Sequence, residues 1–81
     1  MSDTVARLAS KLAEDTLKIQ DAGGEDRLYM DVAKVLGASS QTLEEAFLTE
    51  VRVRLSERSA RAFLVKKLDE LKEKANSGSQ A

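Results

Sequence analysis

Two apolar stripes in the C-terminal half of the chain lie on different sides of the helix that would contain them. The stripes are Leu43, Phe47, Val51 and Leu55, and then Leu64, Leu68, Leu71 and Ala75. A straight helix cannot bury both in one core, because each stripe needs its own side of the helix to face inward. We therefore predict a break at Ser56–Ser59, where a serine can cap a new helix. The alternative is one long unbroken helix whose end leaves the monomer and packs on a second chain.

The composition predicts an all-α fold. Ala, Leu, Glu, Lys and Arg dominate, and the sequence has no proline and no tryptophan. The chain has 81 residues, the size of one small domain. A core of this size leaves only about 3–5 kcal/mol of net stability unless something reinforces it. Because there is no cysteine for a disulfide, dimerisation or docking on a partner is the remaining route to further burial.

The first helix is predicted from a cap at Ser2 or Asp3 to about Gln20. Its expected buried face consists of Val5, Leu8, Leu12, Thr16 and Ile19, widened by Ala9 and Ala13. These residues recur at helical spacing. Gly23 or Gly24 can adopt the left-handed conformation that closes the helix.

A second and a third helix are predicted on either side of a short turn. The second begins near Glu25, whose charge suits the positive end of the helix dipole, and ends at Gly37. The third begins at a cap on Ser39, or on Thr42, which is followed three residues later by Glu45 in the spacing of a capping box. A last helix, after the predicted break, ends near residue 74. The remaining residues, 76–81, are polar and are predicted to form a disordered tail.

The segment Leu28–Ala46 combines several features of a DNA-binding motif. The relevant residues are Leu28, Tyr29, Asp31, Val32, Ala33, Leu36, Gly37, Ala38, Ser39, Gln41, Thr42 and Leu43. A small Ala33 permits close helix approach, Gly37 permits a sharp turn, and Ser39 caps the following helix. The segment thus resembles the helix-turn-helix of bacterial transcription regulators, most nearly the type at the head of LacI-family repressors. The resemblance implies that these side chains face base edges: Ser40, Gln41 and Glu44.

A basic run follows the turn. It consists of Arg52, Arg54, Arg58, Arg61, Lys66 and Lys67. Together with Ser39, Ser40 and Gln41, this run is our candidate face for nucleic acid or for an acidic protein partner. The alternative is a solvated helix face. For the turn itself the alternative is an ordinary helical hairpin, because Glu44 and Glu45 would repel phosphates.

The sequence lacks several of the side chains that most often carry out catalysis. There is no histidine and no cysteine, which removes the commonest general base and the commonest metal ligands. Adjacent carboxylates such as Glu14 and Asp15 point about 100° apart on a helix and do not converge on an ion. Gly23 and Gly24 lack the Lys-Ser/Thr of a phosphate loop. We expect no enzyme, no cofactor and no bound metal.

The expected fold is all-α, a compact bundle of four helices, or of three with a long C-terminal helix, forming one domain over residues 1–75. The predicted core consists of Val5, Leu8, Leu12, Leu28, Val32, Leu36, Leu43, Phe47, Val51, Leu55, Phe63, Leu64 and Leu68. We expect a small non-catalytic protein-interaction or adaptor protein that binds a protein partner or itself, as a homodimer. The alternative is a small helix-turn-helix DNA-binding regulator. No apolar run approaches the roughly 20 residues of a membrane span, and polar Ser2 and Asp3 follow Met1, so we expect no signal peptide and a cytoplasmic protein.

Overall fold

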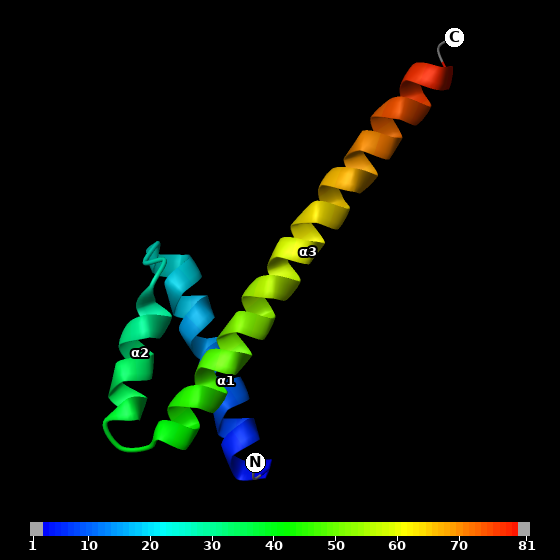
Figure 1. Ribbon diagram of the computed structural model, residues 1–81. Coiled ribbons are helices and arrows are strands. Elements are labelled where there is room, and N and C mark those ends of the chain that lie inside the picture. The colour runs from blue at the N-terminus through cyan, green and yellow to red at the C-terminus, as the bar shows by residue number, and fades with distance from the viewer. Residues whose placement is uncertain (1–2, 80–81) are drawn as a thin grey trace.

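The computed structural model describes residues 3–79, with side chains for residues 3–76. It contains three helices: α1 (Asp3–Gly23), α2 (Leu28–Gly37) and α3 (Gln41–Ser79). The chain runs along α1, returns along α2, and turns again into α3, which packs on both and then projects far beyond them (Figure 1). The all-α class is confirmed, as is the version of the fold with a long C-terminal helix. The four-helix version is wrong.

The turn between α1 and α2 is closed by a left-handed glycine. Gly24 has φ of 72°, and its N–H donates to the carbonyl oxygen of Gln20 at 2.9 Å. The buried Gln20 side chain also spans the turn, because its Oε1 accepts the N–H of Tyr29 at 3.2 Å. α1 therefore extends three residues beyond its predicted end, and α2 begins at Leu28 rather than near Glu25.

The turn between α2 and α3 is capped by a residue that the sequence did not single out as a cap. Ser40 Oγ accepts the N–H of Leu43 at 3.1 Å, so Ser40 is the N-cap of α3. The predictions of Ser39 or Thr42 as the cap are wrong: the Ser39 hydroxyl points back to the Leu36 carbonyl, and Thr42 lies inside the helix. α2 ends at Gly37 as predicted.

Gly37 matters for space rather than for backbone conformation. Its φ is not positive. A Cβ built on Gly37 would lie 2.9 Å from the carboxylate of Glu44, so the glycine leaves room for that side chain to lie against the turn. Glu44 is accordingly half-buried.

The core is small and rich in alanine. Its buried apolar residues are Ala9, Ala13, Leu17, Ala33, Ala46, Phe47 and Val51. Val5, Leu12, Val32, Leu36, Leu43 and Leu55 pack partly buried against it, as predicted, and Leu28 is half-buried. The prediction for Leu8 is wrong, because this side chain is 55% exposed; Ile19, expected on the same face, is 63% exposed. α1 is rotated so that its alanines face the other helices, since small side chains allow helix axes to approach closely.

α3 is a single helix without a break at Ser56–Ser59, so that prediction is wrong. A serine inside a helix costs only a few tenths of a kcal/mol, which is too little to end one. The conflict between the two stripes is resolved differently: every described side chain from Ser56 to Asn76 is exposed. The predicted core residues Phe63, Leu64 and Leu68 therefore lie outside the core.

The projecting helix makes the molecule extended. Its principal dimensions are 65 × 28 × 13 Å and its radius of gyration is 18.3 Å, against about 12 Å expected of a compact chain this long. The prediction of a compact bundle is wrong for this reason. α3 ends at Ser79 rather than near residue 74, and residues 80–81 of the predicted tail lie outside the described residues. None of the helices found in residues 3–79 is long and apolar enough to span a membrane.

Candidate interaction surface

The three predicted site residues at the α2–α3 turn form hydrogen bonds with nearby residues of the chain. Ser39 Oγ donates to the Leu36 carbonyl at 3.5 Å, and Ser40 Oγ caps α3. Gln41 Nε2 donates to Glu45 Oε1 at 3.3 Å, one turn along the same helix. The Ser40 and Gln41 contacts lie at the start of α3, and the Ser39 contact lies at the end of α2.

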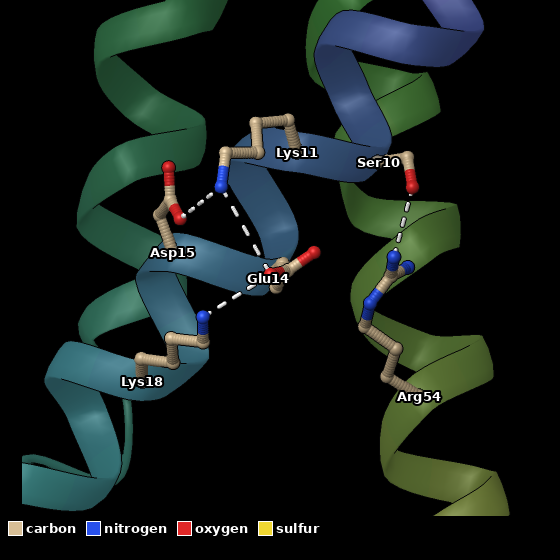
Figure 2. Close-up of polar contacts among 6 residues, drawn as sticks. All are labelled: Ser10, Lys11, Glu14, Asp15, Lys18 and Arg54. Atoms are coloured by element: carbon tan, nitrogen blue, oxygen red, sulfur yellow. Dashed lines mark hydrogen bonds and ion pairs between the residues drawn. The ribbon is translucent and has the colours of Figure 1, made fainter.

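Three arginines of the basic run form ion pairs within the molecule. Arg54 is half-buried; it pairs with Glu50 on α3, and its Nη2 donates to Ser10 Oγ of α1 at 2.9 Å. Figure 2 shows this guanidinium reaching from α3 across to Ser10. Arg61 pairs with Glu57 at 2.6 Å.

Arg58 holds the C-terminal end of α1 against α3. Its Nη1 and Nη2 donate to Oδ1 and Oδ2 of Asp21 at 3.0 and 2.9 Å, a two-pronged geometry that fixes both side chains. Both groups are about half exposed to solvent, so the pair contributes little free energy, about 0–1 kcal/mol. Among the described residues, no ion pair further along α3 reaches α1.

The candidate residues are not gathered on one face. Helical periodicity puts Arg54, Arg58 and Arg61 on one side of α3 and Arg52 with Lys66 on the other. The turn residues are distant too, because 26 residues of helix place Gln41 about 39 Å from Lys67. The structure therefore places the turn residues close to one another, but it does not place the turn close to the basic run.

The charged surface of α1 is paired along its own helix. Lys11 Nζ lies 3.3 Å from Asp15 and 3.9 Å from Glu14, and Lys18 Nζ lies 3.2 Å from Glu14. Figure 2 shows these four side chains linked in a chain on α1, apart from the contact between Arg54 and Ser10. Such exposed i,i+3 and i,i+4 pairs support the helix and need no partner protein.

The most unusual surface is the apolar stripe of the projecting part of α3. We define the α3 stripe as Leu64, Leu68, Leu71 and Ala75. Leu64 is 62% exposed, Leu68 52% and Leu71 53%. These residues share one side of the helix, and no described part of the chain covers them. The stripe is visible in the sequence, but Leu64 and Leu68 were predicted to be core residues. The feature that indicates their exposure is that the stripe lies on a different side of the helix from Leu43–Leu55.

Basic side chains border the α3 stripe on both sides. Helical periodicity places Arg61 and Lys72 along one edge, and Lys67 and Lys74 along the other. The carboxylates of the same segment lie on the far side of the helix: Asp69, Glu70 and Glu73. Lys67 reaches one of them only weakly, with Nζ 4.0 Å from Glu70 Oε2. The stripe is thus apolar in the middle with cations along both edges, and exposed Val65 lies on the same edge as Lys72.

The stripe leads toward a shallow groove between α1 and α3. Leu17 and Val53 are the apolar residues that line this groove, and charged side chains including Glu14, Lys18 and Arg58 line the rest. Val53 is exposed and lies on the same side of α3 as the stripe, three helical turns before Leu64. Glu57 also lines the groove and lies on the stripe side of α3 between Val53 and Leu64, so a charged turn separates the groove from the α3 stripe.

The described residues contain no metal-binding cluster. No group of three or more Asp or Glu side chains among them could hold a metal ion. Comparison of the sequence with models of protein families and with curated proteins, and of the fold with solved structures, finds no match.

Proposed function

We propose that this chain is a small non-catalytic protein-interaction protein, which binds a second copy or a different protein through the α3 stripe. In this proposal the packed region of α1, α2 and the first turns of α3 is a base that holds the rest of α3 out in solvent. Beyond Arg58 the helix continues for another 21 residues, a length of about 31 Å.

The observation that supports the proposal best is the exposure of three leucines in one row. Single exposed apolar side chains are ordinary on protein surfaces, but a row with helical spacing is typical of a surface that packs on another helix. A partner would bury the stripe and add apolar contacts to a small core, which among the described residues has seven buried apolar side chains. Binding would also stabilise the projecting turns of α3, whose described side chains are all exposed from Ser56 to Asn76.

The test uses the full chain and two measurements. Light scattering gives its mass at concentrations up to about 0.5 mM, where even weak association is detected. Fluorescence anisotropy measures its binding to a labelled helical peptide with leucine at both seam positions and glutamine at the bordering positions. We expect either dimer formation or peptide binding, and we expect it to be lost in the triple variant Leu64→Ala, Leu68→Ala, Leu71→Ala.

The matched control is Phe63→Ala, because Phe63 is 65% exposed on the same turn but lies off the stripe. This variant should behave like the natural chain. A monomer that binds no peptide would contradict the proposal, as would binding that survives the triple leucine substitution.

DNA binding through the α2–α3 turn is the less well supported alternative. Ser40 is used as a cap, Glu44 lies against Gly37, and Arg54, Arg58 and Arg61 are paired with carboxylates of the chain itself. Anisotropy of labelled mixed-sequence duplex DNA tests it: steep binding that weakens with salt would favour the alternative, because cations at phosphates supply most DNA affinity.

A further inference from the structure

We propose that the partner of the α3 stripe is an amphipathic helix of another protein whose own apolar stripe is bordered by aspartate and glutamate. This inference rests on the proposed function and goes further, because it names the chemistry of the partner.

The α3 stripe has the width and spacing of a helix-pairing seam. Leu64, Leu68, Leu71 and Ala75 are separated by four, three and four residues, the alternation of the two core positions in a heptad repeat. Four such residues span about 16 Å, or three turns of helix. A narrow stripe of this kind fits the groove of a single partner helix.

The charges at the edges of the seam have one sign. In heptad terms Leu64 and Leu71 occupy one core position and Leu68 the other, which puts Lys67 and Lys74 on one border and Lys72 with exposed Val65 on the other. In paired helices these bordering positions face each other across the seam and determine which partner is accepted. Lysine on both borders therefore favours a partner with carboxylates on both borders.

A second copy of the same helix does not meet this requirement. In a parallel pair, Lys67 of one copy faces Lys72 of the other, and in an antiparallel pair Lys67 and Lys74 come together. Like charges that face each other across a seam destabilise the pair. The acidic residues that could compensate, Asp69, Glu70 and Glu73, lie on the opposite side of α3.

An anionic membrane surface is also less suitable than an acidic helix. Helices that lie in a membrane interface have a broad apolar face, with lysine and arginine over the polar face. Here the apolar face is the α3 stripe with Val65 beside it, and the polar face opposite contains Asp69, Glu70 and Glu73, which anionic lipids would repel. The geometry therefore points to a protein helix.

The experiment measures the binding of three labelled peptides to the full chain by fluorescence anisotropy. Each peptide has about three heptads with leucine at both core positions; the bordering positions are glutamate in the first, lysine in the second and glutamine in the third. We expect the glutamate peptide to bind about tenfold more tightly than the lysine peptide at roughly 0.15 M salt, because its borders attract rather than repel. The difference should shrink at about 0.5 M salt, where charges are screened.

A charge reversal provides the matched control. Lys67 and Lys72 are exposed and distant from the core, so the double variant Lys67→Glu, Lys72→Glu should keep its fold, which circular dichroism checks. It should prefer the lysine peptide to the glutamate peptide. A natural chain or a variant that shows no such preference would overturn the inference.

The outcomes separate this inference from the proposed function. If all three peptides bind equally and the leucine substitutions abolish binding, the stripe binds helices but the acidic partner is wrong. If no peptide binds and light scattering shows a dimer, the partner is a second copy and the inference is overturned, while the proposed function is supported. If the chain stays monomeric, binds no peptide and binds vesicles of about three parts phosphatidylcholine to one part phosphatidylserine, both are overturned.

Discussion

At the scale of single residues, the two phenylalanines show that the position of a side chain decides how much it contributes to the stability of the fold. Phe47 is fully buried in the core, whereas Phe63 is 65% exposed on the free part of α3. Both were predicted to be core residues, because each is a large apolar side chain on a helix. Periodicity alone does not tell whether a second helix is present to cover a given side, and for Phe63 none is present among the described residues.

Replacing Phe47 by alanine should destabilise the fold by about 3–5 kcal/mol, because it removes the largest fully buried side chain and leaves a cavity. In a domain this small, that loss is close to the whole net stability. Phe63→Ala, the control, should change the free energy of unfolding by no more than about 0.5 kcal/mol. Urea denaturation followed by circular dichroism measures both values, and equal stability of the two variants would show that the described core is wrong.

Burial was predicted least accurately from the sequence for the alanines of the core. Ala9 and Ala13 were considered only to widen the face of α1, yet both are fully buried, while Leu8 is more than half exposed. Hydrophobic periodicity gives weight to large side chains. The closest helix contacts, however, need small ones, and these have little hydrophobic signal of their own.

At the scale of elements, helix existence was predictable and helix boundaries were less so. The glycine turn at 23–24 and the end of α2 at Gly37 followed from local chemistry. The start of α3 did not, because residues 39–42 include three side chains that can each cap a helix, and only the three-dimensional turn selects Ser40. The predicted break at Ser56–Ser59 failed because serine weakens a helix too little to interrupt it.

Replacing Ser40 by alanine should cost about 1 kcal/mol, since the N–H of Leu43 loses its side-chain acceptor at the start of α3. Ser39→Ala should cost distinctly less, because its hydroxyl only donates a long bond to a carbonyl already in α2. Thermal denaturation of the two variants side by side provides the comparison. A larger loss of stability for Ser39→Ala than for Ser40→Ala would contradict Ser40 as the N-cap and favour Ser39, one of the two caps predicted from the sequence.

At the scale of the whole molecule, the sequence contained the information for the extended shape but did not decide it. The phase difference between Leu43–Leu55 and the α3 stripe required either a break or a helix that leaves the core, and the structure has the second arrangement. For the candidate basic face, the sequence predicted which residues are cations but not which of them form ion pairs within the chain. Whether each was free depended on partners such as Ser10 and Asp21, which lie 44 and 37 residues away in the chain.

α3 is one straight helix that holds the α3 stripe out in solvent, and this geometry can be measured directly. The distance between spin labels at Thr42→Cys and Glu73→Cys tests it, because both sites are exposed and the natural chain has no cysteine. An unbroken helix predicts a narrow distribution near 46 Å, which is about 31 residues at 1.5 Å each. A broad distribution, or one centred below about 35 Å, would mean that α3 bends or breaks and would contradict the account.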